Sequence, residues 1–457
     1  MMRRCGVAVV LSILFLSIPA LPQSADPMAI AGQIESALGA KRIDQAYVLW
    51  EQYEEDVLGN VGACLKAGRA WADFAGLKEV LRYQDIPADC LDRALACFDS
   101  VDKKLMEEDH ENRILVARGL MKVGDVYIEI GTGDKAAAAQ DRALAMLEAL
   151  AALESHPAGV HADLGAAYSR LAKREPPKAE EHTAKAAAQY DLERKESGDS
   201  SHLCRCIGET RQLLAETREE LLARTPKDKA LAKGVVEAWG QALVSYEQAL
   251  KGDAKNQELK TLYNECLWEA MRVTEGKAKQ KPLMKECKAR YATVKLKLPD
   301  SEWWKVTEED KFKRDDDLFE ALKYDRKSKQ GLFFSIDRYE WRSNYVNEET
   351  GEAVGGDNIG GLARRSEKSA RSYFKNVKDM EKLHPLQLNK RITKAETFSV
   401  KGMTEDNYTA EYRCIFFKES SRQATFKITV IADLGMLDRC PYEMDAILDT
   451  IEVIPRK

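Results

Sequence analysis

The sequence predicts a multidomain protein in which an all-α solenoid of helical hairpins is followed by a small α+β domain with an antiparallel sheet packed on helices. Between Met28 and about Pro299, apolar residues recur every three or four positions, which is the pattern of amphipathic helices. The motif Gly124-Asp-Val-Tyr127 returns 41 positions later as Gly165-Ala-Ala-Tyr168, and a fixed period in this range is typical of stacked helical hairpins. From about Gly331 the apolar residues alternate instead, which predicts strands.

The first 25 residues have the composition of an export signal. Basic residues precede an apolar run from Val7 to Ile18, and this run is too short to span a bilayer as a helix. Cys5 precedes the run, so it is not placed for lipid attachment. We therefore expect residues 1–25 to be a signal peptide and the mature protein to be secreted or periplasmic, with no transmembrane helix. An uncleaved N-terminal anchor is the alternative.

The composition indicates a foldable and mildly acidic protein. There are 70 Lys and Arg residues against 75 Asp and Glu residues, so the chain lacks the positive charge of a general nucleic-acid-binding protein. Hydrophobic residues make up 44% of the chain, which argues against disorder. Its 457 residues are enough for two or three domains.

The helical region, residues 28–299, divides into about six antiparallel pairs. Prolines fall between the predicted helices, where a missing backbone N–H is tolerated. Asp134 and Ser200 stand where helix N-caps are needed. The predicted helices lie near residues 28–40, 43–56, 60–81, 87–104, 110–131, 134–154, 158–174, 177–195, 200–226, 229–251, 256–275 and 280–297.

The repeated motifs resemble those of tetratricopeptide repeats. In that family a Gly or Ala with a Tyr three positions later marks the first helix of a unit, and small residues around a bulky one mark the second. The resemblance implies a concave surface that binds peptides or protein segments, and it implies no reaction. The residues that match, and that we expect to pack between successive helices, are Gly124, Tyr127, Ala138, Ala145, Gly165, Tyr168, Ala179, Ala186, Ala242, Tyr246 and Ala249.

The repeat period departs from that family, in which a unit has about 34 residues. Here the measurable period is 41 residues, and turns such as Lys173 to Pro177 are longer. A generic solenoid of helical hairpins and a closed helical bundle are therefore the alternatives.

The C-terminal part begins with a charged segment, residues 300–330, that predicts a helical linker. We expect Trp303 and Trp304 to dock this linker on the last helical unit. The α+β domain, residues 331–457, has an order of elements that resembles the PsbP-like and DcrB-like α/β/α fold, and that resemblance implies binding or assembly rather than catalysis. Its predicted elements are a strand from Leu332 to about Trp341, a helix from Leu362 to Leu383, strands near 390–401, 406–418 and 421–432, and a helix near 439–451.

The cysteines could form disulfides in an exported chain. Of the 10 in the sequence, Cys5 lies in the predicted signal peptide, so an odd number remains and at least one is unpaired. The best candidates for disulfides are Cys266 with Cys287, across one hairpin, and Cys414 with Cys440, within the last domain. Buried free thiols are the alternative.

No motif for catalysis, a cofactor or a metal ion stands out. The sequence has no His-Glu-x-x-His, no Gly-x-Ser-x-Gly and no dinucleotide-binding fingerprint. The segment His202-Leu-Cys204-Arg-Cys206 carries metal-type ligands, but alternate residues of a helix point apart. We therefore expect no enzyme activity, no cofactor and no metal site.

A basic stripe is predicted on the helix from Leu362 to Leu383, because cations recur there at spacings of three and four. In an acidic protein such a stripe is a local positive field, suited to docking on an anionic surface. A solvated helix face is the alternative. The stripe consists of Arg364, Lys368, Arg371, Lys375, Lys378 and Lys382.

The preferred hypothesis for function is an exported, non-enzymatic scaffold or adaptor. Its helical array would bind a protein or peptide, and its C-terminal domain would dock the complex. The second hypothesis is an envelope-associated accessory protein whose C-terminal domain binds a small ligand, a glycan or an anionic surface. An enzyme with no recognisable motif is the third.

Overall fold

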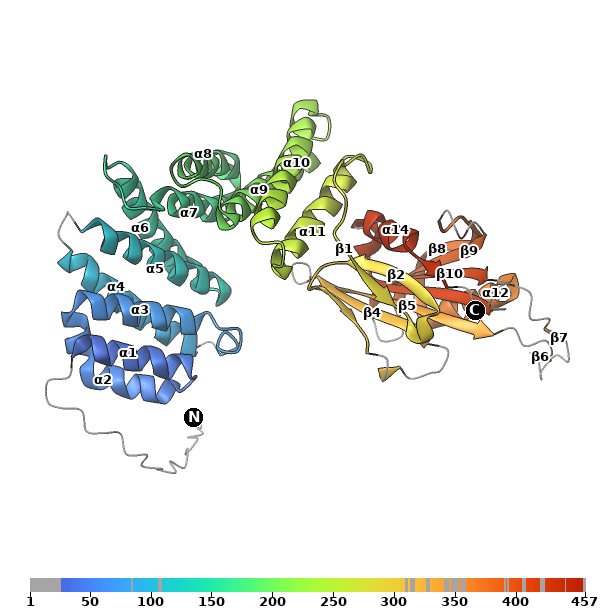
Figure 1. The fold of residues 1–457 in the computed structure, drawn as a ribbon, viewed down its shortest axis with the longest axis horizontal. Coiled ribbons are helices and arrows are strands. Elements are labelled where there is room, and N and C mark those ends of the chain that lie inside the picture. Colours follow the sequence, from blue (N-terminus) through green and yellow to red (C-terminus); the bar gives the residue numbers. More distant parts are fainter. Residues whose placement is uncertain are drawn as a thin grey trace, which may run out of the picture. The chain divides into compact units, whose positions relative to one another are not determined.

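The computed structural model has helices in the N-terminal part of the chain and an antiparallel sheet domain in the C-terminal part, as predicted (Figure 1). The chain divides into two compact units, one up to Leu171 and one from Ala172 onward. The structure describes residues 26–454, apart from 84, 106–108, 309–310, 313–316, 326–328, 341–344, 347–352, 355–358, 390–391, 393, 405–407, 420–423 and 440. The predicted signal peptide, residues 1–25, lies outside the described residues.

The first unit stacks its helices in two layers. Each of α1, α3 and α5 forms a hairpin with the helix that follows it, and α3 packs on both α1 and α5 (Figure 1). We call α1, α3 and α5 the first-helix layer. The helices are α1 (Pro27–Gly39), α2 (Ile43–Gly59), α3 (Val61–Ala75), α4 (Asp85–Lys104), α5 (His110–Glu129), α6 (Gly133–Ala151) and α7 (Val160–Arg174), the last of which crosses the boundary between the units.

Local signals set the helix ends of the first unit. The Asn60 side chain accepts the backbone N–H of Ala63 at 2.9 Å and so caps α3. At the end of α5, Gly131 has a φ of +79°, a conformation that glycine adopts without steric cost. The predicted cap at Asp134 is wrong, because α6 begins one residue earlier and its N-cap is Thr132.

Aromatic side chains fill the space between the two layers of the first unit. Trp71 of α3 is fully buried, with Tyr47 stacked on it at 5.5 Å between ring centroids and Trp50 at its edge. Phe98 of α4 reaches toward α5 because Gly119 leaves room for its ring: a Cβ built at Gly119 would lie 2.2 Å from it. A glycine is therefore required at this crossing of helices.

The second unit begins with helices that pack in the same way. Ser200 caps α9, accepting the backbone N–H of Leu203, so this predicted cap is confirmed. Gly208 of α9 lies against the ring of Tyr246 on α10, where a Cβ would be only 2.8 Å from the ring. The elements are the 3₁₀ turn η1 (Pro176–Lys178) and helices α8 (Ala179–Ser197), α9 (Ser201–Arg224), α10 (Lys229–Gly252) and α11 (Gln257–Val273).

The described residues of the sheet domain in the second unit form three sheets. A seven-stranded antiparallel sheet has the order β3-β4-β5-β11-β10-β9-β8, a three-stranded sheet has the order β1-β2-β12, and β6 pairs with β7. The strands are β1 (Met284–Lys288), β2 (Val294–Pro299), β3 (Trp304–Val306), β4 (Asp317–Asp325), β5 (Gln330–Glu340), β6 (Tyr345–Val346), β7 (Ala353–Val354), β8 (Phe374–Leu386), β9 (Ala395–Thr404), β10 (Thr409–Glu419), β11 (Ala424–Asp433) and β12 (Glu452–Val453). The helices are α12 (Ile359–Tyr373), α13 (Met436–Arg439) and α14 (Pro441–Asp449), with a 3₁₀ turn η2 (Arg290–Ala292).

Both faces of the large sheet carry apolar clusters. On one face, side chains such as Phe334 and Phe417 join Leu296 of β2 and Ile447 of α14 in a single buried cluster. On the other face, Phe398, Cys414 and their neighbours pack with α12. The alternation of buried side chains along each central strand follows from the pleat.

Helix α11 is joined to the sheet domain by polar contacts. Lys260 pairs with Asp300 at 2.8 Å, and the Asn264 amide both donates to and accepts from the backbone of Leu283. Glu302 donates its backbone N–H to the Thr261 hydroxyl at 3.0 Å. Residues 300–302 thus dock on the last helix through these groups, whereas Trp304, which was expected to do so, donates its indole N–H to Glu443 of α14.

Three predicted helices differ from the structure. Residues 280–297 hold η2 and strands β1 and β2, because alternation in Val294-Lys-Leu-Lys-Leu298 buries every second side chain. The predicted linker helix is wrong, since residues 300–330 contain strands β3 and β4. The predicted helix 362–383 ends at Tyr373 and continues as β8, paired with β9. In each case pairing with a neighbouring strand outweighs local helical spacing.

Among the described residues, no helix combines the length and the apolar character that crossing a bilayer requires.

Candidate functional site

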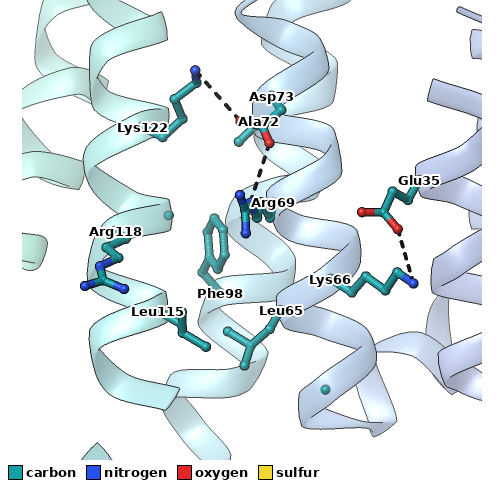
Figure 2. Close-up of a pocket in the computed structure, with 12 residues that line it drawn as sticks. Glu35, Leu65, Lys66, Arg69, Ala72, Asp73, Phe98, Leu115, Arg118 and Lys122 are labelled. Carbon is teal, nitrogen blue, oxygen red and sulfur yellow. Dashed lines mark ion pairs between the residues drawn. The ribbon is translucent and has the colours of Figure 1, made fainter. Parts of the chain in front are cut away.

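A pocket of about 620 Å³ lies in the first unit, over the first-helix layer (Figure 2). We call it the repeat pocket. Its size falls in the range of sites that bind a ligand or a few side chains of a partner. The lining residues are Glu35 of α1, Gly62, Leu65, Lys66, Arg69, Ala72 and Asp73 of α3, Phe98 of α4, and Leu115, Arg118, Gly119 and Lys122 of α5.

Helical spacing brings these residues to one surface. On α3 the lining positions recur at intervals of three and one, and on α5 they run from Leu115 to Lys122 in the same manner. Residues three or four apart share a helix face, so each helix presents one stripe. Because α3 packs on both α1 and α5, the stripes meet.

The floor of the repeat pocket is apolar. Phe98 comes up from α4 between α3 and α5, and Leu65 and Leu115 point toward each other beside it (Figure 2). Leu115 is 42% exposed, which is unusual for a leucine in a helix that packs on three others. The small residues Gly62 and Gly119 keep the space above the floor open.

The rim of the repeat pocket is charged. Lys66 pairs with Glu35 at 3.2 Å, and Asp73 lies between Arg69 at 3.7 Å and Lys122 at 3.8 Å (Figure 2). The side chains of these pairs are between 36% and 82% exposed, so the pairs add little to stability. Little free energy therefore opposes their rearrangement.

The repeat pocket is lined by apolar and charged side chains. Among its described lining residues there is no His, Cys, Ser or Thr that would serve as a nucleophile or as a general base near neutral pH. An apolar floor with a charged rim buries an apolar side chain while its polar neighbours set the orientation.

The structure buries most of the residues predicted to pack between helices. Tyr127 also donates its hydroxyl to Asp92 at 2.9 Å, and Tyr168 donates to Glu148 at 2.6 Å. Burial of each tyrosine raises its pKa, for Tyr168 to about 12. The buried residues of the predicted set are Gly124, Tyr127, Gly165, Tyr168, Ala179, Ala186, Ala242, Tyr246 and Ala249.

The predicted packing role is wrong for Ala138 and Ala145, which are exposed. The buried face of α6 is formed instead by Ala136, Ala139 and Ala143. In this alanine-rich helix the spacing of small residues is the same on more than one face, so composition does not identify the buried one.

The predicted basic stripe is divided between two elements. Arg364, Lys368 and Arg371 are exposed on α12, whereas the other three cations belong to β8. A single helical stripe is therefore wrong, because the helix ends at Tyr373. The β8 cations are Lys375, Lys378 and Lys382, all exposed on a strand at the edge of the seven-stranded sheet.

The predicted disulfide between Cys266 and Cys287 is absent, and the one between Cys414 and Cys440 involves a residue outside the described part of the chain. Cys287 and Cys414 carry free thiols, and Cys440 lies outside the described residues. The Cys266 sulfur lies 3.9 Å from the backbone oxygen of Trp239, inside the core of the helices. Burial raises the pKa of both Cys287 and Cys414. These cysteines act as small apolar core residues.

The sequence reasoning missed the repeat pocket. Its signals are present in the sequence, because Arg69 and Asp73 are four apart on α3, and Leu115, Arg118 and Lys122 recur every three or four residues on α5. These spacings indicate a shared pocket only when α3 and α5 are known to be neighbours. Comparison of the sequence with models of known protein families and with curated proteins finds no match.

Proposed function

We propose that this protein is an exported, non-enzymatic scaffold or adaptor whose helical array binds a protein or peptide segment in the repeat pocket. The observation that carries the proposal is the pocket itself, with Leu115 exposed beside Phe98 and charged pairs at its rim. A hydrophobic anchor inserted into such a floor, with polar contacts around it, is the usual arrangement of a binding hot spot.

The hairpin stacking supports a tetratricopeptide-like array. The paired helices, the buried Gly124 and Tyr127, and their recurrence at Gly165 and Tyr168 all agree with that repeat architecture. In such arrays a stripe of first helices is the natural binding surface, because each hairpin adds one segment to it. Export is part of the proposal and rests on the predicted signal peptide, residues 1–25.

The test of binding is capture of a partner by the mature chain. The wild-type protein and a Leu115→Glu variant are immobilised and exposed to an extract of the source cell's envelope, and retained proteins are identified by mass spectrometry. The matched control is Ile128→Glu, on the same helix α5, where the side chain is 54% exposed and does not line the pocket.

We expect a defined protein to be retained by the wild type and by Ile128→Glu and to be lost with Leu115→Glu. A partner that Leu115→Glu still retains would place binding elsewhere on the chain. Circular dichroism and thermal unfolding of both variants show whether a loss arises from unfolding.

A second candidate function is docking of the C-terminal domain on an anionic surface. It is favoured by the exposed cations Arg364, Arg365 and Lys368 on α12, while Arg371 pairs with Glu367 at 3.8 Å. The α/β/α order of this domain agrees with a PsbP-like or DcrB-like module, whose role would be binding of a surface, glycan or small ligand. Sedimentation with vesicles of anionic lipid tests it: charge reversal at Arg364 and Lys368 should abolish co-sedimentation, and unchanged co-sedimentation rejects the α12 surface.

A further inference from the structure

The cations of the repeat pocket are not fully neutralised by its acids. Lys66 has Glu35 as its own partner, and Arg118 has Asp163 at 2.7 Å. Arg69 and Lys122 share the single carboxylate of Asp73. The pair of cations around Asp73 therefore carries one surplus positive charge.

The contacts around Asp73 are loose. Arg69 lies 3.7 Å and Lys122 lies 3.8 Å from its carboxylate oxygens, both beyond hydrogen-bonding distance. The Arg69 side chain is 82% exposed. Arg69 also precedes Asp73 by four residues on α3, and a base that precedes the acid makes a weaker helical ion pair than the reverse order. Exposed pairs of this kind are weak, so little is lost when they open.

We propose that the repeat pocket selects a peptide segment that carries a carboxylate next to an apolar side chain, and that Asp73 competes with the ligand carboxylate for Arg69 and Lys122. This inference rests on the proposed function and specifies the chemistry of the partner. The apolar side chain lies on Leu65, Phe98 and Leu115, and the carboxylate lies between the two cations at the rim.

The geometry fits such a segment. Arg69 lies on α3 and Lys122 on the neighbouring α5, and both side chains are directed at Asp73 (Figure 2). A guanidinium group can donate two parallel N–H bonds to one carboxylate, and the present contact with Asp73 does not use this geometry. The apolar floor lies within the same pocket, so adjacent residues of one segment reach both features.

Removal of Asp73 should strengthen ligand binding, although Asp73 lines the pocket. Its carboxylate lowers the local positive potential in the free protein, and its removal leaves both cations for the ligand. Asp73→Asn should therefore tighten binding of an acidic segment by about threefold. Arg69→Gln and Lys122→Gln should each weaken it by roughly tenfold, because a charge-assisted hydrogen bond is lost.

The experiment begins with selection of peptides from a random library on the immobilised mature chain. Enriched peptides are labelled with fluorescein, and their affinities for the variants are measured by fluorescence anisotropy. The matched controls are Lys135→Gln and Asp99→Asn, which remove exposed ion-pairing groups at the contact of α4 with α6, outside the pocket. Thermal unfolding of each variant shows that it is folded.

We expect enriched peptides to contain Asp or Glu beside an apolar residue, to bind Asp73→Asn more tightly, and to lose affinity with Arg69→Gln and Lys122→Gln but not with the controls. Enriched peptides that are lost with Leu115→Glu yet are indifferent to Asp73, Arg69 and Lys122 overturn this inference and leave the proposed function standing. Peptides that bind Leu115→Glu as well as the wild type, or no enrichment at all, overturn the proposed function.

Discussion

The ammonium group of Lys323 lies 2.6 Å from a carboxylate oxygen of Glu443, and both side chains are almost completely buried. Lys323 belongs to β4 and Glu443 to α14. The same ammonium contacts Glu265 of α11 at 3.1 Å, and the other oxygen of Glu443 accepts the indole N–H of Trp304 at 2.9 Å. One buried cation thus connects the last helix of the array, the large sheet and the closing helix.

Removal of this cation should be costly. Lys323→Met leaves the Glu443 carboxylate buried without its ion-pair partner, and we expect the free energy of unfolding to fall by about 3–5 kcal/mol. Urea unfolding followed by circular dichroism measures the loss. The double variant Lys323→Met/Glu443→Leu should recover a large part of it, since no uncompensated charge remains. A loss below about 1 kcal/mol for the single variant would contradict a buried role for this pair.

A methyl group at Gly119 should strain the crossing of α4 and α5. The new Cβ would lie 2.2 Å from the ring of Phe98, so the ring must move, and overpacking of this kind costs about 1–3 kcal/mol. The matched control is Gly240→Ala on α10, where a Cβ meets no atom within 4 Å and the helix should gain about 0.5–1 kcal/mol. Thermal unfolding of the two variants should therefore shift in opposite directions, and shifts of equal sign would reject the close approach.

The Cys90 thiol should be unreactive in the folded protein. Burial is the main cause that raises its pKa to about 11 from the ordinary value of 9.0. The folded state therefore holds this proton more tightly than the unfolded state does. The resulting stability is complete below pH 9.0 and is lost as the pH rises toward about 11.

Two measurements check this expectation. A thiol reagent such as 5,5′-dithiobis(2-nitrobenzoic acid) should modify Cys90 only after denaturation. The stability advantage of the wild type over Cys90→Ala should shrink between pH 9.0 and about 11. Rapid modification of Cys90 in the native chain would show that the thiol is accessible.

The lysines of β8 should keep the protein from associating. β8 is an edge strand of the seven-stranded sheet, and Lys375, Lys378 and Lys382 are exposed along it. Pairing of this edge with another chain would bury these cations and is therefore disfavoured. Lysines on an edge strand are a common means by which sheets avoid aggregation. Replacement of all three by Thr should increase light scattering at high concentration, whereas replacement by Arg should not. Equal scattering from the two triple variants would assign these lysines another role.

The helices and the three hairpin-linked strands were predictable because their signals are local. Helices α1–α11 lie within a few residues of their predicted positions, and caps such as Ser200 mark where they begin. Strands β9, β10 and β11 alternate over about ten residues with short connections, so each strand pairs with its neighbour in sequence.

The errors arise where a contact between elements, which the local spacing does not report, decides the structure. β2 finds one of its partners in β12, about 150 positions later, and no local pattern reports that pairing. At Tyr373 the helical spacing of cations continues, but Phe374 is buried in the cluster under α12 and the chain joins β9 as a strand. The repeat pocket escaped prediction for the same reason, since it depends on which faces of α1, α3 and α5 meet.

The pairing of β12 with β2 has a mechanical consequence. The clasp consists of the pairs Glu452 with Lys295 and Val453 with Val294, and the Thr450 hydroxyl accepts the backbone N–H of Lys297 at 2.8 Å. A pull on the C-terminal residues therefore acts first on this short pairing in the three-stranded sheet, before it reaches the seven-stranded sheet. If force is applied through a tether after Val453, we expect the pairing of β12 with β2 to open at low force while the seven-stranded sheet stays folded.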